Sequence, residues 1–207
     1  LIYIKKGDLD KALGYFERAL VNAEELGDKS QIAYSLYNIG VVHYNKGDYD
    51  KTLEYYKMSL EIREKIGEKL WIRVSLFNIG IVYADKGEYD KAEEYLEKSL
   101  AIQKEIGVGA DDLLETITSL FLTYKYLGKE YDEKEIHTLI KEAENIEFEI
   151  NLQLYELLAD KSYLETAYNQ IQEKVAAMED EFQDNFINYL IPKKIIEEYN
   201  KVFKISS

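Results

Sequence analysis

Two asparagines one repeat apart, Asn38 and Asn78, are the side chains best suited to molecular recognition in this sequence. A carboxamide donates and accepts hydrogen bonds at once, so it can hold the backbone of an extended peptide. The alternative is that each amide only bonds a neighbouring turn of its own fold. The choice between these interpretations depends on the elements that carry the two residues.

Residue types that commonly perform catalysis or bind metals are few and scattered. The absence of cysteine excludes disulfides, thiolate zinc sites and cysteine nucleophiles. His43 occupies the place that Tyr83 holds in a sister segment, which indicates a core position, and His137 lies far from it along the chain. The carboxylate pairs lie on polar helix faces, where solvation opposes acid–base catalysis. We expect no enzymatic activity, no metal and no cofactor.

Composition favours a helical protein whose partners are other proteins. One proline and 11 glycines in 207 residues argue against a turn-rich β fold. The formal charge of −14 repels phosphate backbones and anionic lipids, so no nucleic acid and no membrane is expected as partner. No apolar run approaches the roughly 18 residues of a membrane span. A cytoplasmic location is expected.

Glycines divide the sequence at regular intervals. Three of them open the similar segments GDLDKALGYFERAL, GDYDKTLEYYKMSL and GEYDKAEEYLEKSL, with a period of 40 residues, at Gly7, Gly47 and Gly87. A second set falls midway, at Gly27, Gly67 and Gly107. Glycine tolerates the left-handed backbone that often follows a helix, and Asp8 and Asp48 can cap the next helix. Each interval therefore predicts one helix.

Apolar residues within each interval recur at helical spacing and predict one buried stripe per helix. One such stripe contains Ile32, Leu36, Ile39, Gly40 and His43. The following helix carries a small residue where two backbones approach, at Ala12, Thr52 and Ala92 in successive units. Neighbouring helices are expected to pack as antiparallel pairs.

An N-I-G-x-V helix followed by G-x-Y-D-K-A resembles the tetratricopeptide repeat (TPR), over about 3.5 units at residues 1–28, 29–68, 69–108 and 109–148. The 40-residue period is similar to the lengthened repeats of kinesin light chains and of adaptors that organise G-protein and spindle complexes. The resemblance implies an all-α fold, a right-handed α-solenoid of antiparallel helix pairs in a TPR-like superhelix. In the fourth unit Ser119 replaces the asparagine, and an extra residue leaves the register open by one or two positions.

The C-terminal segment, residues 149–207, lacks the glycine marks and is interpreted as a further helical pair with capping helices. The pair is expected at 146–159 and 162–178, with Ser162 and Glu165 spaced as a capping box. A short helix is expected near Phe186. Pro192 is expected as the first residue of a last helix at 192–203.

The resemblance also implies where a ligand would bind, because first helices of successive tetratricopeptide repeats line a concave groove. The groove residues implied are Tyr34, Tyr37, Asn38, Val41, Tyr44, Phe77, Asn78, Ile81, Thr118, Ser119 and Leu122. Asn38 and Asn78 resemble the asparagine ladder of peptide-binding arrays, shortened to two rungs because Ser119 interrupts it. The aromatic side chains are either interface anchors or packing between repeats.

Some tetratricopeptide domains clamp a C-terminal carboxylate with basic groove residues. The matching positions here hold no basic residue: Tyr34, Tyr37, Val41, Val74, Phe77, Ile81, Glu115, Thr118 and Leu122. A carboxylate clamp is therefore not expected.

The sequence predicts a protein–protein interaction scaffold or adaptor that binds a peptide or helix of a partner protein in its groove. The alternative is a sensory or docking arm of a larger enzyme or signalling protein whose catalytic module lies outside this segment, because the chain opens inside a repeat and more chain is expected upstream. The incomplete first repeat also predicts an apolar surface and possible end-to-end self-association.

Overall fold

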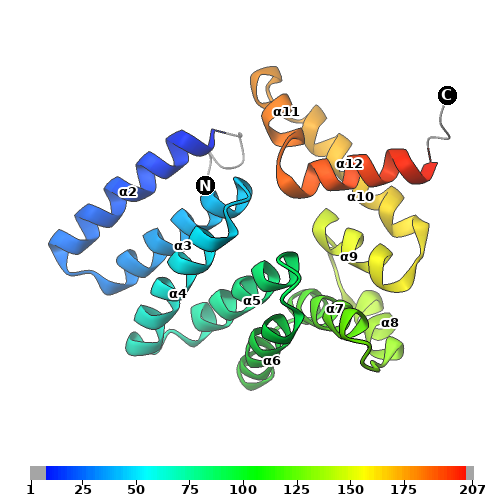
Figure 1. Ribbon diagram of the computed structural model, residues 1–207, viewed down its shortest axis with the longest axis horizontal. Helices are drawn as coiled ribbons and strands as arrows, with labels where there is room; N and C mark the ends of the chain where they lie inside the picture. Colours follow the sequence, from blue (N-terminus) through cyan, green and yellow to red (C-terminus); the bar gives the residue numbers. More distant parts are fainter. Residues whose placement is uncertain (1–7, 204–207) are drawn as a thin grey trace.

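The computed structural model describes residues 8–203, which form an all-α solenoid of consecutive helices without strands (Figure 1). The helices are α2 (Leu9–Leu26), α3 (Lys29–Asn45), α4 (Tyr49–Ile66), α5 (Lys69–Asp85), α6 (Tyr89–Ile106), α7 (Ala110–Leu127), α8 (Glu133–Glu142), α9 (Phe148–Leu158), α10 (Lys161–Ala176), α11 (Asp180–Ile187) and α12 (Leu190–Phe203). This confirms the predicted fold class. The start of the incomplete first repeat, residues 1–7, lies outside the described residues.

Helix ends follow the glycine and aspartate marks of the sequence. Gly67 ends α4 with a φ of 75° in the left-handed region, which explains why glycine stands there. Asp48 caps α4, because its Oδ1 accepts a hydrogen bond from the Lys51 backbone N–H at 3.2 Å. Glu88, at the same place before α6, makes no such bond, since its carboxylate pairs with Lys91 instead. Within the repeats, the aspartates Asp8, Asp28 and Asp48 cap the helices that follow them, whereas Glu68, Glu88 and Gly109 make no side-chain cap bond.

Two predicted details of the C-terminal helix starts are wrong. The cap of α10 is Asp160, whose carboxylate accepts from the Ser162 backbone N–H at 2.9 Å, so Ser162 lies inside the helix and forms no capping box. Helix α12 begins at Leu190, two residues before Pro192. Proline is tolerated there because the first four N–H groups of a helix have no partner within it.

Close backbone approach within each repeat depends on small residues. A Cβ added at Gly40 would lie 2.6 Å from the Tyr56 ring, and one at Gly80 would lie 2.7 Å from Leu96 Cγ. Thr52 and Ala92, on the facing helices, are fully buried. These contacts pair α3 with α4 and α5 with α6 as antiparallel hairpins, as the sequence predicts.

Polar bonds recur at the same places in successive repeats. The Ser59 hydroxyl donates to the Ala33 carbonyl at 2.7 Å, and one repeat later the Ser99 hydroxyl donates to the Arg73 carbonyl at 3.1 Å.

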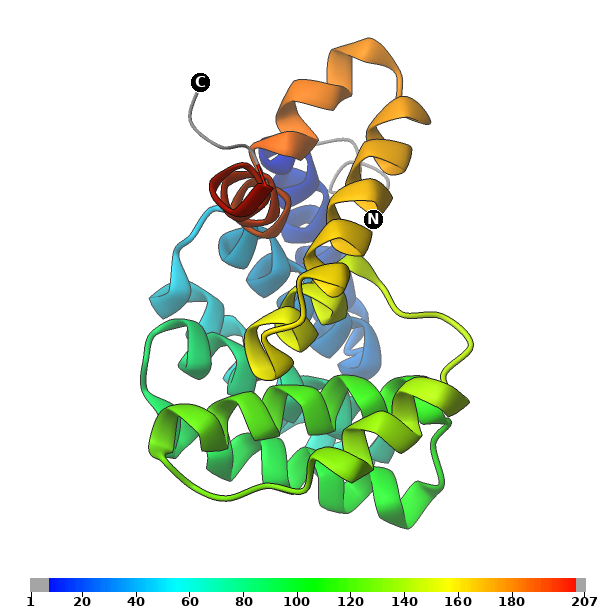
Figure 2. The same cartoon turned by 90° about the vertical axis from the view of Figure 1, so that its right-hand side faces the viewer.

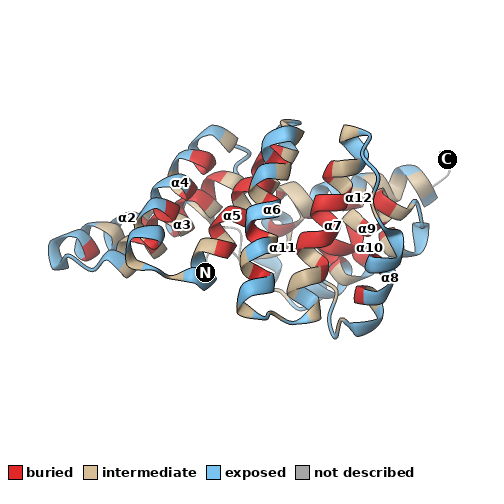
Figure 3. Ribbon diagram, turned by 90° about the horizontal axis from the view of Figure 1, so that it is seen from below, coloured by how far each residue is buried: buried red, intermediate tan, exposed pale blue. Residues whose placement is uncertain are grey.

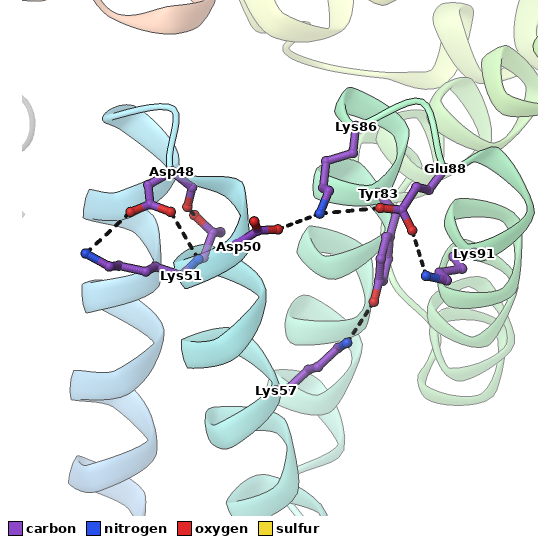
Figure 4. A network of polar contacts seen from close by, with 9 residues as sticks. Asp48, Asp50, Lys51, Lys57, Tyr83, Lys86, Glu88 and Lys91 are labelled. Atoms are coloured by element: carbon purple, nitrogen blue, oxygen red, sulfur yellow. Dashed lines mark hydrogen bonds and ion pairs between the residues drawn. The ribbon is translucent and has the colours of Figure 1, made fainter.

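Ion pairs between repeats recur in the same way. Lys46 Nζ lies 2.6 Å from the Asp10 carboxylate and Lys86 Nζ lies 2.6 Å from that of Asp50. Figure 4 shows Lys86 between Asp50 and Glu88, bridging the two repeats. The 40-residue period of the helices therefore also applies to these ion pairs between repeats.

The helices after α7 depart from this pattern. Helix α8 has only 10 residues, and α9 packs directly on α7 and forms a hairpin with α10 (Figure 1). A buried cluster joins α9, α10, α11 and α12, and Leu9 from the start of α2 packs against it. The C-terminal helices thus return toward the N-terminal repeat, as Figure 2 also shows.

The buried residues lie where the helices face one another, whereas exposed residues cover the outside (Figure 3). On α2 several large apolar side chains are exposed to solvent, with Tyr15 and Val21 each about half exposed. Self-association through this face stays a prediction. Within residues 8–203 no helix combines the length and the apolar character needed to cross a bilayer.

Candidate functional site

The inner helices of the solenoid and its C-terminal helices enclose a cavity of about 830 Å³. Its walls come from α3 to α7 and α9 on one side and from α10, α11 and α12 on the other. Clefts of this size, lined by apolar groups with a few polar ones among them, are typical of ligand-binding sites.

Six of the predicted groove residues line this cavity: Tyr44, Phe77, Asn78, Ile81, Ser119 and Leu122. The other five do not: Tyr34, Tyr37, Asn38, Val41 and Thr118. The residues that line it come chiefly from the second and later inner helices, because the C-terminal helices cover that part of the concave surface.

A row of polar side chains crosses the inner helices. Asn78 Nδ2 donates to the Val74 carbonyl at 2.8 Å and to the Tyr37 hydroxyl at 3.1 Å, which leaves its Oδ1 without a partner in the described part of the chain. The Ser119 hydroxyl on α7 lies 2.9 Å from Gln153 Oε1 on α9, so the Nε2 of Gln153 remains available. The row therefore presents an acceptor at one end and donors at the other.

Asn38 occupies the equivalent place on α3 but is only 2% exposed. Its Nδ2 donates to the Tyr34 carbonyl at 2.8 Å, which is the bond that the structural alternative requires. Tyr37 stacks on Tyr56 with ring centroids 5.1 Å apart, so it takes part in packing between repeats. Phe77, in contrast, is buried and also lines the cavity.

Two carboxyl groups on neighbouring inner helices line one wall of the cavity. Burial raises the pKa of Glu115 to about 7, and Arg73 partly opposes this rise. Glu149 is an exposed residue, but partial burial of its carboxyl raises its pKa to about 7, and the nearby charges of Glu147 and, more weakly, Glu115 raise it further. Neither carboxyl forms an ion pair with any residue from 8 to 203. An unpaired acid pair in a cleft is a frequent feature of functional sites.

Other polar and charged side chains of the cavity already have partners within the protein. The Tyr44 hydroxyl donates to Asp85 Oδ2 at 2.7 Å, joining α3 to α5. Lys194 Nζ on α12 lies 2.9 Å from Glu156 Oε1 on α9. These contacts join the inner helices to each other and to the C-terminal helices.

Sequence reasoning missed four side chains that matter here, Gln153, Glu149, Tyr56 and Lys194. The first two belong to α9, where no glycine marks extend the repeat register. Tyr56 lies at the place of Leu96 in the next repeat, a core position, yet it also lines the cavity. For Glu115 the sequence did give an indication, because this residue occupies a position where a carboxylate clamp would have a basic residue.

The histidines contribute nothing to this site. His43 is 9% exposed and stacks on Tyr55, which confirms the predicted core position, and His137 is exposed on α8. Within the described residues no group of three potential ligands could hold a metal ion.

This geometry defines an α-helical repeat array with a cavity on its inner side. The chain belongs to the tetratricopeptide-repeat family, because two models of this family match residues 1–30 and 31–105. Proteins of this family are in general non-enzymatic scaffolds for protein–protein interaction. A comparison of the sequence with curated proteins gives no match.

Solved structures share the fold at low sequence identity. The apo form of RapI is 19% identical with a TM-score of 0.69, covering 97% of this chain and 81% of its own. A putative kinesin light chain of P. anserina with nearly identical TPR-like repeats is 15% identical with a TM-score of 0.55, covering 98% of this chain and 92% of its own. The second match agrees with the resemblance drawn from the 40-residue period.

A Rap protein complexed with Competence and Sporulation Factor is 14% identical with a TM-score of 0.57, covering 97% of this chain and 62% of its own. BtubC (BKLC) from P. vanneervenii is 23% identical with a TM-score of 0.58, covering 67% of this chain. This chain spans only 56% of the BtubC chain. At these identities the likeness concerns the fold.

Proposed function

We propose that this protein is an interaction scaffold that takes an extended segment of a partner protein, or a free peptide, into the cavity between its inner and C-terminal helices. The observation that carries the proposal is the polar row Asn78, Ser119 and Gln153, which crosses the cavity wall with free hydrogen-bonding capacity at both ends. A peptide backbone offers alternating donors and acceptors and is complementary to such a row.

Apolar side chains flank the polar row and would hold the side chains of the segment. Phe77 and Ile81 from α5 and Leu122 from α7 line the cavity beside it. Burying apolar groups of a ligand here would contribute affinity, while the polar row would set the ligand's direction. The Rap protein complexed with Competence and Sporulation Factor supports the proposal, since its fold accommodates a bound partner.

The spacing of the inner helices sets the length of segment that fits. Packed helices lie about 9 Å apart, so α5, α7 and α9 together span about 18 Å. An extended chain advances about 3.3 Å per residue, and a segment of about five residues therefore crosses the three helices.

The test uses pools of acetylated peptide amides of about six residues, each carrying fluorescein on a C-terminal cysteine. We expect some pools to bind the wild-type chain in fluorescence polarisation. Leu122→Trp fills the cavity and should abolish this binding, whereas Leu70→Trp, at a side chain 53% exposed and outside the cavity, should leave it intact. Equal binding by both variants would place the peptide elsewhere.

The polar row has its own test. Asn78→Ala and Gln153→Ala each remove a hydrogen-bonding group from the cavity wall, and each should weaken peptide binding by about tenfold. Asn22→Ala, on the exposed side of α2, is the matched control and should bind as the wild type does.

The alternative role, as an arm of a larger protein, uses the same cavity. This chain spans 56% of BtubC and 62% of the Rap protein in the complex, so longer chains do carry this fold. The coding sequence upstream of Leu1 separates the two roles. A catalytic module there would favour the alternative, and further repeats would favour the plain scaffold.

A further inference from the structure

The cavity carries more negative than positive charge. Its charged lining residues are Asp85, Glu115, Glu149, Glu156, Lys174 and Lys194. Lys194 neutralises Glu156 at 2.9 Å, and Lys174 turns to Glu147, outside the cavity, at 3.2 Å. Asp85 accepts the Tyr44 hydroxyl. The carboxyls of Glu115 and Glu149 form no ion pair within residues 8–203, although Arg73 lies near the first and Lys174 near the second.

These two carboxyls belong to one place on the wall. Glu115 lies on α7 one turn before Ser119, and Glu149 lies on α9 one turn before Gln153, whose side chain meets Ser119. The charge of Glu115 contributes a small rise to the pKa of Glu149, weaker than the rise from Glu147. The acid pair therefore forms a second row beside the polar row, one helical turn away.

Tyr56 adds a further polar side chain to the cavity wall. Tyr56 is only 2% exposed and lines the cavity, with its ring against Gly40 and stacked on Tyr37. Its hydroxyl has no hydrogen-bond partner among the described residues. The hydroxyl oxygen is not among the buried side-chain atoms without a partner, so in the cavity wall it offers a hydrogen-bonding group besides the acid pair.

We propose that Glu115 and Glu149 together receive one positively charged group of the segment that occupies the cavity, either a basic side chain or a free amino terminus. This inference rests on the proposed function and names the chemistry of its ligand. A cation placed between two carboxylates makes charge-assisted hydrogen bonds to both and relieves their mutual repulsion. The net charge of −14 on the chain attracts such a ligand from solution.

The acid pair also makes binding depend on pH. Each carboxyl must lose its proton to pair with a cation, so affinity should rise as the pH increases through about 7. The charged groups around the pair set this range, namely Arg73 and Asp112 beside Glu115, and Glu147 and Lys174 beside Glu149.

The experiment compares peptide pools with and without a positive charge. One pool set fixes arginine or lysine at each position in turn, and a second fixes citrulline or norleucine, all with acetylated amino termini. A third set leaves the amino terminus of the neutral pools free. Wild-type protein should bind a charged set about tenfold more tightly than the neutral acetylated set, and the charged set that does so identifies the source of the cation.

Glu115→Gln with Glu149→Gln keeps the shape of both side chains and should abolish this preference. The matched control is Glu61→Gln with Glu94→Gln, which removes two charges from exposed side chains that each pair with a lysine on the same helix. The control should retain the preference. Circular dichroism should show equal helical content in all three proteins.

Three results would contradict the inference. If neutral pools bind the wild type as tightly as charged ones, or if the preference survives in the Glu115→Gln, Glu149→Gln variant, the acid pair does not receive a cation although peptide binding stands. If no pool binds the wild type at all, the proposed function fails together with the inference.

Discussion

The regular repeats, α3 to α6, and the helices from α9 to α12 are stabilised by different kinds of contact. In the repeats the same bonds recur, as with Ser59 to Ala33 and Ser99 to Arg73. The C-terminal helices depend on contacts that occur once, such as the stacked rings of Tyr168 and Tyr199 at 3.8 Å.

This difference explains where the cavity lies. A periodic array extends in one direction with the same surface on each unit. Helices without the period can leave that path, and α12 does so, with Lys194 reaching the cavity and Leu9 of α2 packing against the same C-terminal cluster. The candidate site forms where the regular part meets the irregular part.

Core truncation gives the largest expected effect. Leu96 in the repeats and Leu164 in α10 are both 0% exposed, and replacing either by alanine should cost about 2–5 kcal/mol in the free energy of unfolding. Because the two regions use separate contacts, hydrogen exchange should show opening across α9 to α12 for Leu164→Ala and across α5 to α7 for Leu96→Ala. Identical exchange patterns in the two variants would contradict the division into regions.

Close backbone approach should matter next most. Gly80→Ala places a methyl group 2.7 Å from Leu96 Cγ and should cost about 1–3 kcal/mol, measured by urea unfolding. Gly14→Ala on α2 meets no atom within 4 Å and should instead stabilise the helix by up to about 1 kcal/mol. If both substitutions changed the free energy of unfolding in the same direction, the close contact between Gly80 and Leu96 would not be what determines the effect.

The acid pair should make stability depend on pH. A carboxyl whose pKa is higher in the folded than in the unfolded chain stabilises the fold below the unfolded pKa and loses that contribution as the pH rises through the folded value. Glu115 and Glu149, with pKa near 7 when folded, should therefore lower Tm between about pH 5 and about pH 8.

The Glu115→Gln, Glu149→Gln variant should show a flatter curve of Tm against pH in the same calorimetric scans. The raised pKa of Asp85 remains in that variant, so some slope should persist. An unchanged slope would mean that the pair is as well solvated in the folded chain as in the unfolded one.

Helix caps should give the smallest effect, and an equal one in both regions. Asp48→Ala in the repeats and Asp160→Ala in the C-terminal part each remove one bond to a free N–H group and should cost about 1 kcal/mol in thermal unfolding. A clear difference between the two would show that a helix end depends on its region and not only on its cap.

The sequence by itself determined the helices, their pairing in the repeats and part of the concave surface. Turn glycines and capping aspartates act through bonds within a few residues, so Gly67 and Asp48 can be interpreted without knowing the rest of the chain. The repeat period then related Asn38 to Asn78 and Ser119, of which the last two line the cavity.

Only the tertiary structure decided how the cavity closes and which groups meet in it. Gln153 lies beside Ser119, and Lys194 beside Glu156, because the packing angles of several helices add up along the chain, and no local pattern records that sum. For the same reason, the sequence alone does not reveal that Tyr56 and Glu149 line the cavity. A side chain's exposure to a cavity depends on residues far away in the sequence, whereas the start and end of its helix depend on its neighbours.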